Sequence, residues 1–135
     1  MKTGKQVEVF CFRQRKNGVQ YLLLKRVLER GGFWQPITGG NEERETLTET
    51  VIREILEETG IENPERIIET SFSFTFTDHG HNHEEFVYGV KVDPDTKVTL
   101  SDEHNEYKWV DQVVAQKLLV WDGNKKGLEA LTKLI

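Results

Sequence analysis

The amino-acid sequence predicts an α/β fold in which helices pack against a mixed β-sheet. Several runs alternate apolar with polar residues, or are rich in β-branched and aromatic residues, as strands are. One internal segment and the C-terminal segment instead show helical periodicity. Strands on both sides of a single internal helix favour a mixed sheet with helices packed on it, and 135 residues fit one domain spanning 1–135.

The first predicted strands surround a tight turn. Residues 6–12 (QVEVFCF) and 19–26 (VQYLLLKR) read as strands, and the pair Asn17-Gly18 between them is a strong signal for a two-residue hairpin. A glycine-rich stretch then leads into FWQPITGG, where Pro36 favours a strand end or a sheet edge. The first part of the chain is therefore expected to supply a hairpin and a glycine-rich loop.

Residues 46–59 are predicted to form the internal helix. Thr46 and Glu49 fit a capping box with Thr46 as the N-cap, and Gly60 fits the left-handed position just beyond the helix. At about 100° per residue, four aliphatic side chains fall in one arc and four charged ones in the opposing arc. We expect the first set to pack on the sheet and the second to form a polar face: Val51, Ile52, Ile55 and Leu56, against Arg53, Glu54, Glu57 and Glu58.

The remaining chain is predicted to add strands and to end in helices. Strands are expected over three ranges: 67–77, 85–92 and 107–110. Asp111 can cap one terminal helix, and Asp122 or Asn124 can cap a last helix that runs through Leu134. The expected order is thus strands, one helix, more strands and a helical end.

Three histidines lie between two of these strands: His79, His81 and His83. Alternation along an extended strand would place them on one face, which is a possible transition-metal site. Gly80 and Asn82 instead favour a loop over 78–84, near the mouth of the site, and the loop is the expected structure.

Composition limits the classes of function. A net charge of −5 argues against general nucleic-acid binding. No window reaches the roughly 18 apolar residues of a membrane span, and the first residues lack an apolar signal region. Cys11 is the only cysteine, so no intrachain disulfide can form, which is typical of a reducing compartment. We expect a cytoplasmic protein that binds neither nucleic acid nor membrane.

The acidic charge is concentrated in and around the predicted helix. Residues 41–62 hold eight acidic residues and two arginines, a net charge of −6, so the rest of the chain carries +1. The polar face lacks interspersed lysines, and three carboxylates near a helix C-terminus oppose the helix dipole. A divalent cation would relieve both costs, and carboxylates favour Mg²⁺ or Mn²⁺ over zinc. A solvated acidic face without any ligand is the alternative that these residues leave open.

The number of residues that separates the glycines from the charged residues of the predicted helix matches a known pattern. Gly39 is followed by five residues, Glu45, seven residues, and then REILEETGI from Arg53 to Ile61. This pattern resembles the Nudix box at every defining position. Two positions beside the defining ones depart from many relatives: Thr38 stands in place of proline and Arg44 in place of glycine.

The resemblance implies a fold and a chemistry. Nudix domains are α/β/α sandwiches with a mixed sheet, in which the box forms a loop, a helix and a second loop. They hydrolyse a nucleoside diphosphate linked to another group, using water and a divalent metal that is usually Mg²⁺. In this chain the resemblance implies metal ligands at the carbonyl near Gly39 and at three carboxylates: Glu54, Glu57 and Glu58.

The resemblance also implies roles for the other box residues. Arg53 would orient the carboxylates through charge-assisted hydrogen bonds, and Glu54 would bind metal or position the attacking water. Glu45 would pair with Arg53, and it and Gly60 would provide structural support. One carboxylate from outside the box often acts as a ligand or a general base, and Glu103 is favoured for both roles over its neighbour in DEHNEYKW, Glu106.

Three residues are expected to bind substrate. Arg26 ends a predicted strand near the glycine loop and is expected to hold phosphate, with a solvated strand end as the alternative. Trp34 and Tyr88 offer flat rings for a base, although such aromatic residues also serve in cores.

The substrate class is suggested by stretches outside the box. FWQPITGG, DEHNEYKWVD and LLVWDGNKKGLEAL resemble the branch of the family that cleaves dihydroneopterin triphosphate or dATP into a monophosphate and pyrophosphate. A small-molecule nucleotide or pterin triphosphate is therefore the expected partner. Diadenosine polyphosphates, oxidised guanine nucleotides and a nucleotide-binding module without catalysis remain as alternatives, and the sequence does not predict an oligomeric state.

Overall fold

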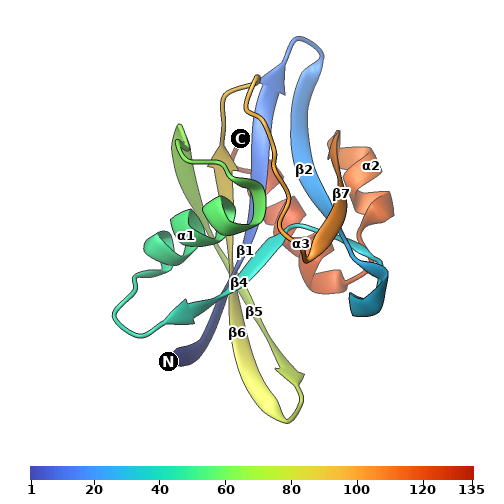
Figure 1. Ribbon diagram of the computed structural model, residues 1–135. Helices are drawn as coiled ribbons and strands as arrows, with labels where there is room; N and C mark the ends of the chain where they lie inside the picture. Colours follow the sequence, from blue (N-terminus) through green and yellow to red (C-terminus); the bar gives the residue numbers. More distant parts are fainter.

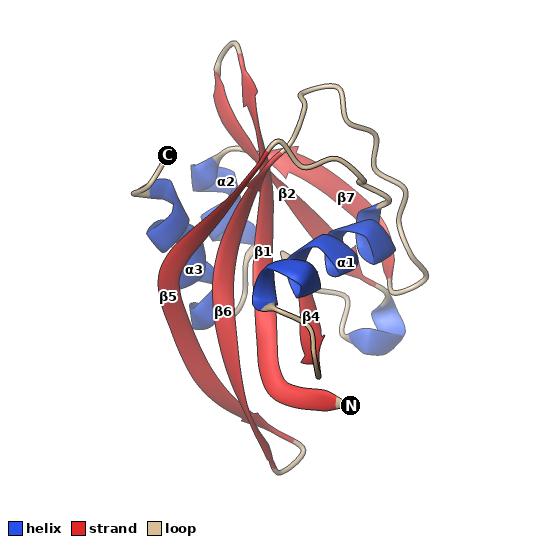
Figure 2. Ribbon diagram, turned by 90° about the vertical axis from the view of Figure 1, so that its left-hand side faces the viewer, coloured by secondary structure: helices blue, strands red, loops and turns tan.

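The computed structural model describes residues 1–135 and places one β-sheet between helices on its two faces (Figures 1 and 2). In chain order the elements are β1 (Lys2–Arg15), β2 (Gly18–Arg26), η1 (Leu28–Arg30), β3 (Trp34–Gln35), β4 (Ile37–Glu42), α1 (Leu47–Thr59), β5 (Arg66–Asp78), β6 (His81–Lys91), β7 (His104–Val110), α2 (Gln112–Leu118) and α3 (Asp122–Thr132). The predicted order of strands and helices is confirmed.

The sheet has seven strands and is mixed, as predicted. Its main order is β3-β2-β1-β6-β5, while β4 pairs with β1 and β7 with β2. Only β1 and β6 run parallel; the other neighbouring strands are antiparallel. None of the helices combines the length and the apolar character that crossing a membrane would require.

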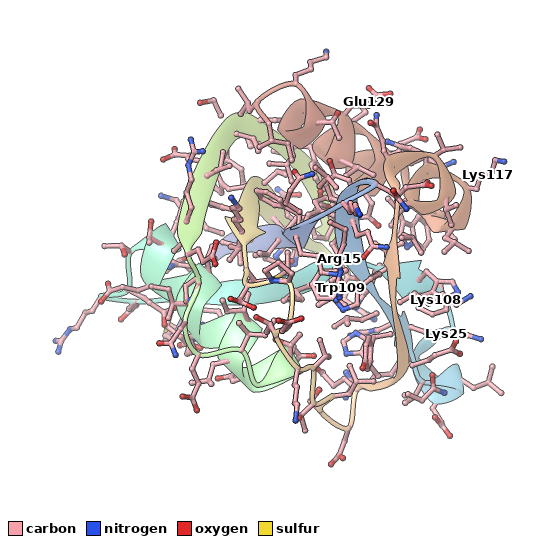
Figure 3. The ribbon with its side chains drawn as sticks, turned by 90° about the horizontal axis from the view of Figure 1, so that it is seen from above. Arg15, Lys25, Lys108, Trp109, Lys117 and Glu129 are labelled. Carbon is pink, nitrogen blue, oxygen red and sulfur yellow. The ribbon has the colours of Figure 1, made fainter.

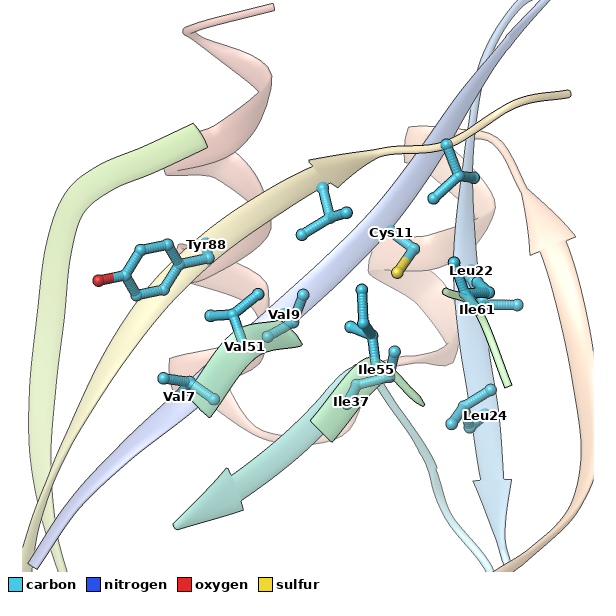
Figure 4. Packing of buried hydrophobic residues seen from close by; sticks show 12 residues of the cluster. Val7, Val9, Cys11, Leu22, Leu24, Ile37, Val51, Ile55, Ile61 and Tyr88 are labelled. Carbon is cyan, nitrogen blue, oxygen red and sulfur yellow. The ribbon is translucent and has the colours of Figure 1, made fainter. Parts of the chain in front are cut away.

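Alternation along β1 divides the interior into two cores. Val7, Val9 and Cys11 belong to the cluster that packs with α1, and Figure 4 shows Val51 and Ile55 of α1 beside these strands. The intervening residues of β1 face α2 and α3, where the second cluster lies: Phe10, Phe12, Tyr21, Leu23, Ile68, Val87, Ala115, Leu119, Leu128 and Leu131. Because strand side chains alternate between faces, one strand anchors both layers of helices.

Helix α1 begins and ends where the sequence predicts. Thr46 accepts a hydrogen bond from the backbone of Glu49 at 3.1 Å, and Glu49 accepts one from the backbone of Thr46 at 2.8 Å, which completes the capping box. Gly60 adopts a φ of 72° and closes the helix with a hydrogen bond to Leu56. The helix ends are thus determined by local residues.

The orientation of α1 about its axis differs from the prediction. Ile52 and Leu56 are 42% and 47% exposed, whereas Glu54 and Glu58 are each only 6% exposed. The arc that packs on the sheet therefore includes two glutamates, and two expected core residues face solvent. Glu54 lies against Gly39 of β4, and Glu58 is held by Ser101 and His104. Helical periodicity carries no information about such long-range contacts.

Two hairpin turns differ from the prediction. Arg15 pairs with Gly18, so the first hairpin turns at residues 16–17, one position before the predicted pair. Residues 78–84 are not a loop, because β5 and β6 pair up to Asp78 and His81 around a tight turn at 79–80. Nowhere in the chain do three histidine, cysteine or acidic side chains gather as a metal-binding group, so the three histidines do not form one.

The start of α3 also differs from the prediction. Its N-cap residue is Trp121, which makes no side-chain capping bond, and Asp122 is the first residue of the helix. Asn124 does not cap the helix either; its amide nitrogen donates to Glu8 on β1. Asn124 is therefore a tie between α3 and the sheet.

A pair of buried carboxyl groups lies beneath α3. Glu8 on β1 is fully buried and Glu85 on β6 is 5% exposed. A side chain at Gly127 of α3 would overlap the Glu8 carboxyl, so the helix backbone approaches this group closely. Burial, and then the neighbouring Glu85, raise the pKa of Glu8 well above its usual range, and burial raises the pKa of Glu85 to about 7. The pair therefore retains a proton near neutral pH.

This pair predicts a specific dependence of stability on pH. Because the folded state binds more protons than the unfolded state, the free energy of unfolding should fall as pH rises from the ordinary glutamate value of 4.5 through about 7. Glu8→Gln should flatten this decline and make the variant more stable than the parent at about pH 8. Urea unfolding across this range measures the effect, with the exposed Glu65→Gln as control; an unchanged slope would contradict it.

Candidate active site

The site lies along the flank of α1 that faces β4 and the residues just before β7. Gly39 on β4 pairs with Val7 of β1, which places it beside the helix. A side chain at Gly39 would overlap the carboxyl group of Glu54, so only glycine allows this close approach. The glycine and the glutamate of the box are thus in direct contact.

An ion pair joins the loop before α1 to the helix. Arg53 Nε lies 2.7 Å from Glu45 Oε2 and Arg53 Nη2 lies 2.9 Å from Glu45 Oε1, a bidentate arrangement. Arg53 Nη2 also donates to the Gly40 carbonyl at 2.8 Å. The hydrogen bonds from Arg53 lower the pKa of Glu45 to about 2, and Glu45 raises the pKa of Arg53. The supporting role predicted for Glu45 agrees with this geometry.

The loop that carries this ion pair contains a left-handed residue. Arg44, which stands where many relatives have glycine, adopts a φ of 70°. Non-glycine residues adopt this conformation rarely, at a cost of about 1–2 kcal/mol. The loop therefore keeps the turn that glycine would favour, despite the substitution.

Arg53 also contacts two of the proposed metal ligands. Its Nη1 atom lies 3.3 Å from Glu54 and 3.4 Å from Glu57. Burial first, and then the charge of Glu57, raise the pKa of Glu54 to about 7, although Arg53 opposes the shift. Glu57 itself is half exposed. Arg53 thus holds three carboxylates of the box around one guanidinium group.

Glu58, one turn further along the same side of α1, is held by Ser101 before β7 and by His104 at the start of β7. Ser101 donates to its Oε2 atom at 3.1 Å, and His104 Nδ1 lies 3.0 Å from the same oxygen without being aligned as a hydrogen bond. Burial favours the neutral acid, but His104, Glu103 and Ser101 together outweigh it, so the pKa of Glu58 is lowered. His104 is itself fixed by Gln35, at 2.9 Å.

Glu103 lies beside Glu58. Burial first, and then the hydrogen bond and charge of Glu58, raise the pKa of Glu103, while Arg26 and Arg30 lower it. Arg30 Nη1 lies 3.0 Å from Glu103 Oε1. Glu106 instead pairs with Lys25 across β2 and β7, away from these carboxylates.

The three predicted substrate-binding residues do not come together. Arg26 pairs with His104 across the strands and its Nε atom is buried without a hydrogen-bond partner. Trp34 packs with the cluster on the α2/α3 face. Lys25 and Lys108, which are labelled in Figure 3, lie 5.9 Å and 5.1 Å from its ring.

Tyr88 lies apart from both of these residues. It is 3% exposed within the α1-side core, and it is labelled in Figure 4. Of the three, only Arg26 lies among the acidic residues.

The donor chemistry of the site fits a hard divalent cation. Carboxylate oxygens and a backbone carbonyl are the ligands that Mg²⁺ and Mn²⁺ prefer. Burial and then the charge of Glu57 raise the pKa of Glu54, and a cation would relieve the repulsion between these two carboxylates. No three acidic side chains converge as a formed metal-binding group, however, and Arg53, His104 and Arg30 contact the carboxylates instead.

Sequence reasoning missed three residues of the site. His104 and Arg30 contact the acidic side chains directly, and Ser101 donates to Glu58. The stretch SDEHNEY did draw attention to Glu103, and a histidine next to that glutamate was a usable signal. Nothing in the sequence around Arg30 indicated a place in the site, because its approach to Glu103 depends on how β2 and β7 pair.

Comparison with known proteins identifies solved structures that share this fold. A candidate NUDIX hydrolase from Listeria monocytogenes str. 4b F2365 is 28% identical, with 95% of this chain and 91% of that one covered and a TM-score of 0.83. The dihydroneopterin triphosphate pyrophosphohydrolase of E. coli is 22% identical, with 99% and 98% covered and a TM-score of 0.83. The Ap4A hydrolase of C. elegans, in a binary complex, is 21% identical, with 96% of each chain covered and a TM-score of 0.83. The last two show a shared fold.

A curated relative and a family model complete the comparison. The octanoyltransferase of Myxococcus xanthus is 32% identical over 128 residues, which are 93% of this chain but 36% of that protein. The chain thus spans about a third of the length of that relative. The model described as the NUDIX domain matches residues 4–131. Because that match covers nearly the whole chain and includes the complete box, the chain belongs to the NUDIX domain family.

Proposed function

We propose that this chain hydrolyses a diphosphate linkage in a nucleoside or pterin triphosphate, releasing a monophosphate and pyrophosphate. The observation that carries the proposal is the set of carboxylates along α1 and beside it: two are buried, Glu54 and Glu58, and Glu103 approaches from another segment. A structural acidic face would not need carboxylates drawn inward against glycine and histidine. A cytoplasmic location remains the expectation from the single cysteine.

The proposed cation is Mg²⁺, with Mn²⁺ as a substitute. Glu57 and Glu58 would hold it, together with Glu54, Glu103 and a carbonyl near Gly39. When bound, such a cation supplies charge neutralisation for the phosphates and polarises a phosphoryl oxygen. An anionic substrate could then approach a surface that would otherwise repel it.

The side chains of the chain itself perform the remaining tasks. Arg53 keeps the carboxylates oriented through its contacts with Glu54 and Glu57. Glu54, held against Gly39 and beside Arg53, is suited to bind the cation or to position a water molecule and accept its proton. Arg26, whose Nε atom is buried without a partner, is suited to bind a phosphate oxygen.

Substrate identity is tested with a panel of nucleotides. The purified chain with Mg²⁺ or Mn²⁺ should convert dATP or dihydroneopterin triphosphate to the monophosphate and pyrophosphate, identified by chromatography. Preference for diadenosine tetraphosphate or an oxidised guanine nucleotide would retain the chemistry and change the substrate. Absence of turnover with every compound would contradict the proposed enzymatic activity and favour a nucleotide-binding module without catalysis.

Glu57→Gln is expected to lower kcat/KM by about 100-fold or more, because it removes a carboxylate that would hold the cation against the phosphates. The thermal midpoint should change little, since the Glu57 side chain is about half exposed. The exposed residue Glu62, just beyond the same helix, provides the control as Glu62→Gln. Full activity of Glu57→Gln would show that the site is assigned wrongly.

Glu103→Gln and Glu106→Gln distinguish the two candidates outside the box. Glu103→Gln is expected to lower kcat by about 10²- to 10⁴-fold, as removal of a general base or ligand does. Glu106→Gln should remain within a few-fold of the parent chain, because Glu106 pairs with Lys25 away from the carboxylates. Steady-state kinetics with excess Mg²⁺ measure both, and the reverse pattern would transfer the role to Glu106.

A further inference from the structure

A short turn that carries one arginine contacts Glu103 at the acidic site. We call residues 27–32, between β2 and β3, the arginine turn; Arg30 is its only basic residue. Local hydrogen bonds shape it, from Arg30 N to Val27 O at 2.9 Å and from Gly32 N to Val27 O at 3.2 Å. No residue of η1 is buried, and Leu28 is 83% exposed. The turn therefore has little packing to hold it in one position.

Two contacts join the arginine turn to the segment before β7, and both involve Glu103. Val27 N donates to the Glu103 carbonyl at 3.0 Å, and Arg30 Nη1 lies 3.0 Å from Glu103 Oε1. The side chains of Arg30 and Glu103 are 53% and 39% exposed, so water reaches the ion pair. Exposed ion pairs of this kind are weak and exchange readily. The backbone tie can keep the turn in place while the side-chain pair opens.

Two glycines give the turn room to move. Gly31 and Gly32 have φ values of 111° and 65°, a region that glycine enters without strain. They follow Arg30 directly, so its backbone can rotate without disturbing β3. Arg30 can therefore swing while Val27 stays tied to Glu103.

Glu103 cannot serve Arg30 and a cation equally well. Its carboxyl already lies beside Glu58, and drawing both onto one cation would remove the partner of Arg30. Arg26, on the same side, has a buried nitrogen without a partner. A released Arg30 would thus stand next to Arg26 and present a planar guanidinium group, which suits phosphate oxygens.

We propose that Arg30 exchanges partners during binding: it pairs with Glu103 in the free chain and with the phosphate chain of the substrate in the complex, where with Arg26 it favours triphosphates over diphosphates. The proposal rests on the proposed function, because it assigns a phosphate-chain length to the same site. A purely structural Arg30 would instead only fasten the turn to Glu103.

The variant Arg30→Gln distinguishes the exchange of partners from the purely structural role when both its metal binding and its kinetics are measured. Without nucleotide, Mn²⁺ titration followed by calorimetry should show tighter binding, by about 2- to 5-fold, because Glu103 is released. With a nucleoside triphosphate, KM should rise about tenfold while kcat stays within about threefold. With the corresponding diphosphate, KM should change far less. Glu29→Gln, an exposed change on the same turn, is the matched control. Arg30→Lys keeps the positive charge, so its KM should lie between those of the parent chain and Arg30→Gln.

Three outcomes would overturn the proposal. Unchanged Mn²⁺ affinity with unchanged KM would show that Arg30 does not exchange partners. A fall in kcat at constant KM, or weaker Mn²⁺ binding, would assign it a structural role. Equal losses on triphosphates and diphosphates would remove the chain-length preference. If no compound is hydrolysed, calorimetry with the Mg²⁺ complex of inorganic tripolyphosphate still compares Arg30→Gln with the parent chain, so failure of this proposal is distinguishable from failure of the proposed function.

Discussion

The bidentate pairing of Arg53 with Glu45 is the contact on which the site depends. It joins the loop before α1 to the helix, and through the Gly40 carbonyl it joins both to β4. That three-way attachment fixes the rotation of α1 about its axis. With the rotation fixed, Glu54 is pressed against Gly39 and Glu58 is turned toward His104. Two carboxylates are thereby buried at the price of exposing two aliphatic side chains.

The concentration of negative charge is tolerated because basic groups reach it from several separate segments. Arg53 lies within the helix, His104 begins β7, and Arg26 and Arg30 stand at and after the end of β2. Arg53 contacts carboxylates of the box, His104 contacts Glu58, and the two arginines near β2 both act on Glu103, so no single ion pair neutralises the acidic site. The resulting site has carboxylates that are oriented but only partly compensated, which is a suitable starting state for taking up a cation and an anion together.

Local signals in the sequence predicted much of this fold. Thr46, Glu49 and Gly60 determine the ends of α1 through neighbours within four residues, and the strands follow from alternation. The spacing from Gly39 to Gly60 identified the box correctly. The 78–84 hairpin was missed because Gly80 and Asn82 suit both a loop and a tight turn, and only cross-strand pairing decides between them.

The orientation of α1 and the position of the aromatic rings could not be predicted in the same way. Periodicity assigns glutamate to the solvent side, and the partners of Glu58 are more than forty residues away, at Ser101 and His104. Trp34 and Tyr88 were chosen for their flat rings, but strand register decides which face of the sheet each one occupies. Register depends on long-range pairing and not on composition.

The parallel pairing of β1 with β6 has a consequence for how the chain becomes folded. Lys5 lies opposite Glu84, so β1 gains its parallel neighbour only after more than half of the polypeptide has been synthesised. Contacts this distant along the chain slow folding, because a long loop must close before they form. On the ribosome, α1 and its acidic residues emerge first and wait for the strand that completes the sheet beneath them.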